Sequence, residues 1–293
     1  DQARAEELAN KHGAKVSSSL GRLLRNCDAV YVCTPPSARL KETVAAARAG
    51  KHIFAEKPLC LTMTQARKIA RAIEQAGVHF MVGYVLHYWP AFKAVRQTLA
   101  SGELGGLQVC WCNRMGTGPR GGWIEDPNQS GGMTVEFNSH DIDWLRWVGG
   151  EVREVYGKTL TIPGDGIERN VWAILTFDQG IGVLGSSWAA PIGWSVFGAI
   201  GSKGMVFCGQ DGKVRKRLSG ADETEVVPEP VENALLEEDR HFVHSLLANT
   251  KPTIGMAEAL GALEVSLAIQ KSSATGKPVR LPAVSRVEPP VKG

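Results

Sequence analysis

Residues 29–36 read Ala29-Val30-Tyr31-Val32-Cys33-Thr34-Pro35-Pro36, an apolar run closed by a threonine and two prolines. Unbroken runs of this kind are typical of parallel strands that are buried on both faces. Two similar runs follow at 52–55 and 78–82, and helical patterns at about 37–49 and 63–76 separate the three. This alternation predicts βαβ units with right-handed crossovers, and therefore a doubly wound parallel sheet.

Beyond residue 104 the pattern changes to short strands, several of them separated by turns such as Asp178-Gln179-Gly180, as in antiparallel hairpins. The expected strands are 107–115, 152–162, 171–177, 181–188, 195–200 and 205–208, and the expected helices are about 135–148, 232–248 and 257–274. We therefore predict an α/β protein with two domains: 1–103 with the parallel sheet, and 104–293, an α+β domain with a large, mainly antiparallel open sheet. Most of the eight tryptophans lie in the second domain and indicate a sheet face that needs cover, such as a subunit interface.

The composition excludes several classes of protein. A chain of 293 residues that is 43% hydrophobic and 22% charged has an ordinary globular balance and is not disordered. Its net charge of +3 and the lack of a basic stripe argue against a nucleic-acid partner. No apolar run approaches the roughly 20 residues that span a membrane. The six cysteines form no CxxC pair, so we expect reduced thiols and a cytoplasmic location.

The first candidate site is Glu56-Lys57-Pro58, directly after the second apolar run. Ligands of open parallel sheets bind outside the carboxyl ends of the strands, so a lysine at this edge points into the crevice. The proline fixes the backbone and is compatible with a cis peptide bond. The alternative is a solvated charge pair at the end of a strand.

The second candidate site is the segment 131–143, Gly-Gly-Met-Thr-Val-Glu-Phe-Asn-Ser-His-Asp-Ile-Asp. On one helix, Glu136, His140 and Asp143 share a face, because they are four and three residues apart. An imidazole beside carboxylates is held in one tautomer and becomes a better base. The paired glycines allow close approach of another group. A surface ion pair is the alternative, and we predict no metal because one histidine with two carboxylates is a thin ligand set.

Two further stretches carry a weaker signal. Residues 116–121 match GxGxxG literally, but no helical pattern follows them, so a flexible loop is expected rather than a phosphate-binding turn. Tyr84, His87, Tyr88 and Trp89 leave the third apolar run as an aromatic, hydrogen-bonding cluster. The cluster suits either a sugar-like ligand or packing between the domains.

Together these stretches resemble the Gfo/Idh/MocA family of nicotinamide-dependent oxidoreductases over almost the whole chain. Residues 29–36 are similar to the family's fourth strand and its cofactor-contacting turn, and residues 51–59 contain its EKP signature. Residues 83–90 resemble the link between the domains, 131–143 the catalytic helix, and 275–279 the closing strand. The resemblance implies that the first domain is a Rossmann-like dinucleotide-binding domain.

The resemblance also implies roles for individual residues. Lys57 would orient the substrate hydroxyl and relay its proton, His140 would be the general base, and Glu136 stands where the family more often has Asp. Arg39 and His87 replace residues that are frequent in the family, and we expect these changes to affect substrate identity rather than reaction type. The implied cofactor, NAD or NADP, would contact Thr34, Pro35, Pro36, Glu56, Lys57, Pro58 and Trp123. The implied substrate would contact Lys57, Tyr84, His87, Glu136 and His140.

The family's GxGxxG belongs to a first strand–turn–helix, which the sequence given does not contain. We expect that the natural protein is longer, that the parallel sheet as given is N-terminally truncated, and that this chain alone binds NAD weakly because the pyrophosphate-binding helix end is missing.

The predicted function is hydride transfer between NAD(P) and a secondary hydroxyl group of a sugar, cyclitol or related polyol, in a homodimer or homotetramer. An NAD-dependent glycosidase that uses transient oxidation and elimination is the first alternative, and a non-catalytic binding or assembly protein is the second.

Overall fold

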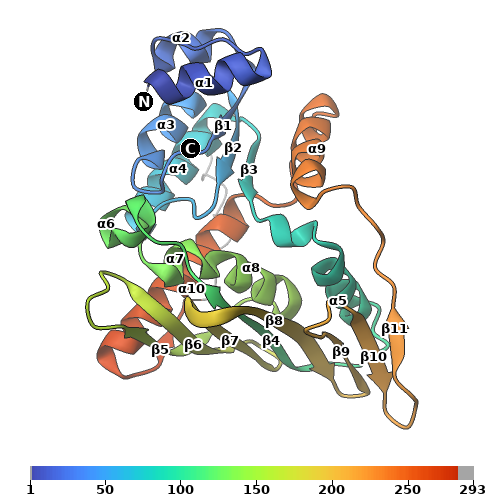
Figure 1. The fold of residues 1–293 in the computed structure, drawn as a ribbon. Coiled ribbons are helices and arrows are strands. Elements are labelled where there is room, and N and C mark those ends of the chain that lie inside the picture. The colour runs from blue at the N-terminus through green and yellow to red at the C-terminus, as the bar shows by residue number, and fades with distance from the viewer. Residues whose placement is uncertain (1, 283–293) are drawn as a thin grey trace, which may run out of the picture.

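The computed structural model describes residues 2–282, and its N-terminal part forms a parallel sheet in the order β1-β2-β3 (Figure 1). The strands are β1 (Ala29–Val32), β2 (His52–Glu56) and β3 (Phe80–Gly83). The helices of this small unit are α1 (Gln2–His12), α2 (Leu20–Arg25), α3 (Arg39–Arg48) and α4 (Met63–Ala76). Among the described residues β1 pairs only with β2, and it therefore forms one edge of the sheet.

Helix α4 shows how local sequence fixes these boundaries. The Thr62 hydroxyl accepts the Gln65 N–H and caps the first turn, and Gly77 ends the helix in the left-handed conformation at φ 64°. Between these caps, Ala66, Ile69 and Ile73 recur at helical spacing and are buried. The apolar face thus packs into the core, while the ends are set by residues that satisfy free backbone groups.

The second part of the chain builds a nine-stranded sheet in the order β11-β10-β9-β8-β4-β7-β6-β5-β12. Its central pair, β4 and β7, is parallel, and every other neighbouring pair is antiparallel. The strands are β4 (Leu107–Thr117), β5 (Glu154–Thr161), β6 (Glu168–Thr176), β7 (Ile181–Ser187), β8 (Ala189–Gly201), β9 (Gly204–Cys208), β10 (Val214–Leu218), β11 (Thr224–Val226) and β12 (Val279–Arg280).

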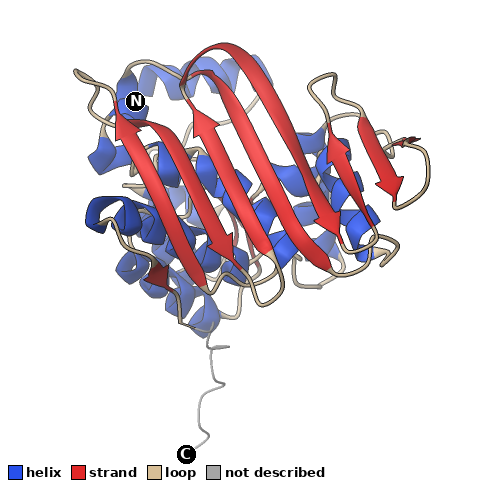
Figure 2. Cartoon of the chain, turned by 90° about the horizontal axis from the view of Figure 1, so that it is seen from below, coloured by secondary structure: helices blue, strands red, loops and turns tan. Residues whose placement is uncertain are grey.

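Helices cover one face of this sheet, and the other face is bare (Figure 2). The remaining helices are η1 (Val85–His87), α5 (Pro90–Ala100), η2 (Gly122–Glu125), α6 (Pro127–Ser130), α7 (Met133–Glu136), α8 (Asn138–Gly149), α9 (Ala234–Leu247) and α10 (Met256–Thr275). Helix α10 contacts β5 and α8 in the large unit and also α4 and β3 in the small unit. The two units are therefore held against each other by one long, buried helix.

The predicted fold class is confirmed: a parallel Rossmann-like sheet is followed by a large, mostly antiparallel sheet. Strands β10 and β11 were not predicted, because both lie toward one end of the sheet and Val214–Leu218 carries three charged residues rather than an apolar alternation. The domain boundary at residue 103 stays a prediction, since α5 precedes it but packs against β8, β9 and α8. Within residues 2–282, no helix has the length and apolar character needed to cross a membrane.

Candidate functional site

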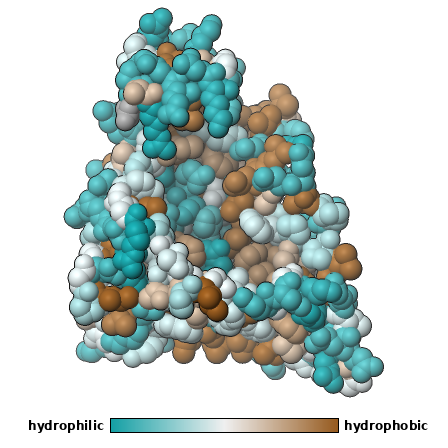
Figure 3. All heavy atoms as spheres, viewed as in Figure 1, coloured by the Kyte–Doolittle hydropathy of each residue, from teal (hydrophilic) through white to brown (hydrophobic). Residues whose placement is uncertain are grey.

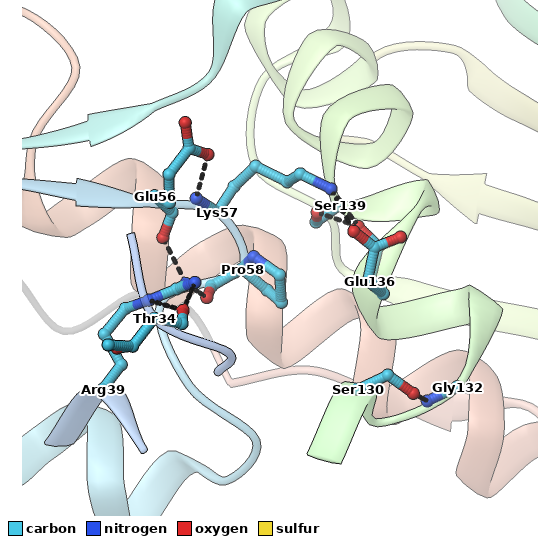
Figure 4. A network of polar contacts seen from close by, with 9 residues as sticks. All are labelled: Thr34, Arg39, Glu56, Lys57, Pro58, Ser130, Gly132, Glu136 and Ser139. Carbon is cyan, nitrogen blue, oxygen red and sulfur yellow. Dashed lines mark hydrogen bonds and ion pairs between the residues drawn. The ribbon is translucent and has the colours of Figure 1, made fainter. Parts of the chain in front are cut away.

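The two units meet where Lys57 reaches from the end of β2 to α7 (Figure 4). Its Nζ lies 2.7 Å from Glu136 Oε1 and donates to the Glu136 backbone carbonyl at 2.8 Å. Both side chains are only 13% exposed, so this ion pair is largely shielded from solvent. The peptide bond between Lys57 and Pro58 is cis. The sequence separated these residues by 79 positions, and the fold makes them partners.

A buried arginine holds the turn that carries Lys57. Arg39, at the start of α3, is 2% exposed, and its Nε donates to the Thr34 carbonyl at 3.1 Å. Its terminal nitrogens donate to the carbonyls of Thr34, Glu56 and Pro58, and so join the exits of β1 and β2 (Figure 4). Burial lowers the pKa of Arg39 to about 10. Because these donors bind the protein backbone, they are not free to contact a substrate, and the expected effect of Arg39 on substrate identity stays a prediction.

The predicted catalytic helix is interrupted. Helix α7 ends at Glu136 and α8 begins at Asn138, with Phe137 between them, so the expected single helix over 135–148 is wrong. At this break the Glu136 carbonyl accepts from Lys57 Nζ and also from Ser139 Oγ at 3.1 Å. The side-chain donors that this carbonyl receives coincide with the interruption between the two helices.

His140, in the first turn of α8, does not receive the carboxylate partners that the spacing predicted. Within residues 2–282 no hydrogen bond or ion pair joins its ring to Glu136 or Asp143, and its buried Nδ1 has no hydrogen-bond partner. The Glu136 carboxylate forms an ion pair with Lys57 instead. The pKa of His140 lies well below its usual value, first because the ring is buried and then because Lys57 and Arg114 are nearby cations. The imidazole is therefore neutral at neutral pH, which is the form a base requires.

Asp143, three residues after His140 on α8, belongs to a separate pair. Its Oδ2 lies 2.7 Å from His87 Nε2, and the His87 ring stacks on Trp147 with centroids 4.0 Å apart. Burial raises the pKa of Asp143, and its hydrogen bond with His87 opposes that shift. Tyr84, by contrast, lies next to His140: its buried ring packs edge-on against the imidazole at a centroid distance of 6.2 Å.

The paired glycines before α7 accommodate a side chain rather than a ligand. Gly132 has φ 82°, and a Cβ there would stand 2.3 Å from a Glu168 carboxylate oxygen. That carboxylate accepts the Thr134 N–H at 3.0 Å and the Thr134 hydroxyl at 2.6 Å, which caps α7 from the neighbouring strand. The glycine therefore serves to anchor α7, the helix that ends at Glu136.

A cavity of about 700 Å³ lies beside His140, and part of its wall is Arg114 on β4. Figure 3 shows this face of the molecule hollowed between the upper and lower units, with apolar residues along much of the hollow. Arg114 was not among the predicted site residues, although the sequence pattern around it indicates its orientation. Cys110 and Cys112 are fully buried, and a strand turns every second residue to the same face, so Arg114 faces the helical layer as well.

The remaining predicted residues lie at different distances from this cluster. Thr34 lies between the end of β1 and Arg39, and its Oγ1 is buried without a hydrogen-bond partner. Trp123 is half-buried on the short 3₁₀ helix η2, and within residues 2–282 no hydrogen bond or ring contact joins its side chain to Lys57 or His140. The loop with the literal GxGxxG leads into η2 and not into a long helix, so it lacks the geometry of a phosphate-binding turn.

Comparison with known proteins places these features in a family. Residues 1–84 match the description "Oxidoreductase family, NAD-binding Rossmann fold", and residues 92–207 match the "GFO/IDH/MocA C-terminal domain". The chain is 28% identical to scyllo-inositol 2-dehydrogenase (NAD(+)) of Bacillus subtilis, over 96% of this chain and 86% of that one. It is 25% identical to myo-inositol 2-dehydrogenase of Thermotoga maritima, over 88% of this chain and 81% of that one.

A solved structure shares the fold. The aldose-aldose oxidoreductase of Caulobacter crescentus, complexed with glycerol, superposes with a TM-score of 0.88 at 22% identity, and the match covers 96% of this chain and 89% of that one. Both family descriptions, the relatives and the two-sheet architecture agree. The chain belongs to the Gfo/Idh/MocA family of NAD-binding oxidoreductases.

Proposed function

We propose that this protein transfers a hydride between NAD(P) and a secondary hydroxyl group of a sugar, cyclitol or related polyol. One observation carries the proposal: the amine of Lys57, from the small unit, reaches α7 and acts electrostatically on His140 of the large unit, whose imidazole lines a cavity. Lys57 is held by Glu136 at 2.7 Å, and His140, four residues further along, lines the cavity. The inositol dehydrogenases among the relatives support the substrate class.

The residues at the strand ends fit the nicotinamide end of the cofactor. Thr34 Oγ1 is buried and has no hydrogen-bond partner in the described chain, so it is available to a bound group. We assign contacts with the cofactor to Thr34, Pro35, Pro36, Glu56, Lys57, Pro58 and Trp123. When bound, the nicotinamide supplies the two-electron acceptor or donor for the carbinol carbon.

The protein supplies positioning and proton transfer. The Lys57 ammonium, oriented by Glu136, would donate a hydrogen bond to the substrate hydroxyl oxygen. Since Nδ1 of His140 is buried, its Nε2 is the nitrogen that would take the hydroxyl proton as the carbinol is oxidised. Tyr84 would support the ring of His140 from the side, and His87 would contact substrate through the part of its ring that Asp143 leaves free.

Two substitutions test these roles. Lys57→Ala and His140→Ala should each lower turnover about 100-fold or more, because each removes a group that acts on the reacting hydroxyl. Lys93→Ala is the matched control, since Lys93 forms an exposed ion pair with Glu229 and lies outside the site. Turnover close to that of the wild type in either site variant would contradict the assignment.

The same assay separates the alternatives. A dehydrogenase accumulates reduced nicotinamide in proportion to the alcohol consumed. An NAD-dependent glycosidase would release sugar from a glycoside without net reduction of the cofactor. A binding or assembly protein would do neither, and the His140 substitution would then change no rate.

We further propose that two or four subunits associate through the bare face of the large sheet. Large apolar side chains on strands β5 and β6 are exposed: Leu160 is 61%, Trp172 48% and Ile174 46% exposed. Contiguous apolar area of this kind commonly marks a protein–protein interface.

A further inference from the structure

The cavity beside His140 has apolar walls and few polar groups. Aromatic side chains from η1–α5, from the α7–α8 junction and from β8 line it: Trp89, Phe92, Phe137, Trp194 and Phe197. A volume of about 700 Å³ accommodates a small-molecule ligand. Flat aromatic faces suit the apolar faces of a sugar ring.

Arg114 is the charged group in this wall. Its Nε lies 2.6 Å from Asp141 Oδ1, and its guanidinium carbon lies 4.4 Å from the centroid of the Phe137 ring, which also lines the cavity. These contacts fix the inner edge of the guanidinium. No hydrogen bond joins Nη1 or Nη2 to a residue of the described chain, and the side chain keeps 21% of its exposure. The two outer nitrogens are therefore donors available to a ligand, and Arg114 forms part of the cavity wall.

The charges around the cavity favour an anion. Neither aspartate nor glutamate appears among the described residues that line it, and the only other ionisable side chains there are His140, which is neutral, and Cys208. Asp141, fully buried behind the wall, accepts from Asn138 at 3.1 Å and from Cys112 at 3.3 Å. The Arg114–Asp141 pair thus presents its positive end to the cavity.

The free donors also specify the shape of the anion. Donors at the wall of an apolar cavity gain most from a ligand that offers an acceptor to each of them. Nη1 and Nη2 form a planar fork that matches the two oxygens of a carboxylate, whereas a single hydroxyl occupies one donor only. A carboxylate satisfies the pair better than a neutral polyol does.

Building on the proposed function, we propose that the substrate is an acidic sugar: a pyranose with a carboxylate, such as a uronic acid or its glycoside, whose carboxylate binds Arg114. The ring packs against the aromatic walls, and a secondary carbinol lies at His140. In the oxidative direction the carbinol C–H bond breaks and its electron pair passes with the hydrogen to NAD⁺ or NADP⁺. The hydroxyl proton passes to His140, a ketone forms, and the carboxylate is unchanged.

The test compares matched pairs of sugars. The methyl glycosides of glucuronate and glucose, and of galacturonate and galactose, are assayed with NAD⁺ and NADP⁺, and their equilibrium binding is measured by calorimetry. We expect the wild type to prefer each uronate over its neutral partner at least about tenfold in kcat/KM and in affinity. Arg114→Gln should bring this ratio close to one, mainly through KM, because the carboxylate takes no part in the bond changes at the reacting carbon.

Two further variants keep the result interpretable. Arg114→Lys preserves the positive charge beside Asp141 and loses only the two parallel guanidinium donors. Its preference for uronates over neutral sugars should therefore lie between that of the wild type and one, and this variant can be measured even if Arg114→Gln fails to fold. Arg153→Gln, an exposed arginine paired with Asp178, should leave the ratio unchanged. Equal affinity for uronates and neutral sugars, or a ratio that Arg114→Lys and Arg114→Gln both leave intact, overturns the inference. Uronate binding through Arg114 without any cofactor reduction would instead overturn the proposed function and keep the acidic-ligand site.

Discussion

Arg39 and Arg114 show how differently the two units use the same side chain. Arg39 in the small unit is 2% exposed and gives its donors to the carbonyls of Thr34, Glu56 and Pro58. Arg114 in the large unit is anchored at one edge by Asp141 and keeps two nitrogens free toward a cavity. A guanidinium that is saturated by backbone fixes geometry, whereas one with free donors recognises a ligand. In the proposed function, the small unit would therefore position the reactive amine, and the large unit would select the substrate.

The largest expected effect tests whether the two units form one site. Lys57→Ala and His140→Ala should each reduce turnover by a factor of about 100 or more, and the double variant should be barely slower than the worse single variant. The two losses in activation free energy should not add, because Lys57 and His140 act on the same hydroxyl group. Once one of them is removed, the other contributes little to the rate. Steady-state kinetics of the four proteins measure the coupling. Fully multiplicative losses would mean that the two residues act independently.

The next largest effect tests whether Arg39 holds the backbone of the small unit in place. Arg39→Leu should lower the free energy of unfolding by at least about 2 kcal/mol, because three backbone carbonyls lose their donor in a buried place. Urea denaturation followed by tryptophan fluorescence measures it. Arg153→Leu, which removes an exposed ion pair with Asp178, should cost under about 1 kcal/mol. Equal losses in the two variants would remove the positioning role of Arg39.

The pH dependence of the reaction tests the environment of His140. Its pKa in the folded protein lies below the usual value of 6.5, so the base stays neutral and the acidic limb of kcat/KM falls below pH 6.5. Arg114→Gln removes a nearby cation and should move this limb to higher pH.

The lowered pKa of His140 also makes the free energy of unfolding depend on pH. Below pH 6.5 the unfolded chain binds a proton that folded His140 does not, so unfolding free energy falls as the pH falls, and His140→Gln removes that contribution.

The smallest effect on turnover is expected at the bare sheet face. Trp172→Lys and Leu160→Lys should shift the protein toward monomers in light scattering, because a charge replaces exposed apolar area at the proposed interface. Turnover per subunit should stay within about twofold, since exposed substitutions away from the site perturb the fold little. An unchanged assembly in both variants would move the interface elsewhere.

Much of the small unit followed from sequence, for a local reason. The apolar run 52–55 became β2 at His52–Glu56, and the pattern at 63–76 became α4 between Thr62 and Gly77. Caps and continuous apolar runs act within a few residues, so one stretch of sequence contains the whole signal. Strand order in the large sheet was beyond such reasoning, because the parallel pairing of β4 with β7 joins segments about 70 residues apart.

The candidate site divides in the same way. The sequence by itself determined which residue types stand at which strand and helix ends: Lys57 after β2, Glu136 and His140 near α8, and Thr34 after β1. Only the tertiary structure decided their partners. Lys57 forms an ion pair with Glu136, His87 pairs with Asp143, and Nδ1 of His140 has no hydrogen-bond partner. Spacing along a helix gives the direction of a side chain but not the energy of competing partners. A lysine or histidine from another element displaces the neighbour that the sequence suggests when its geometry and burial are better.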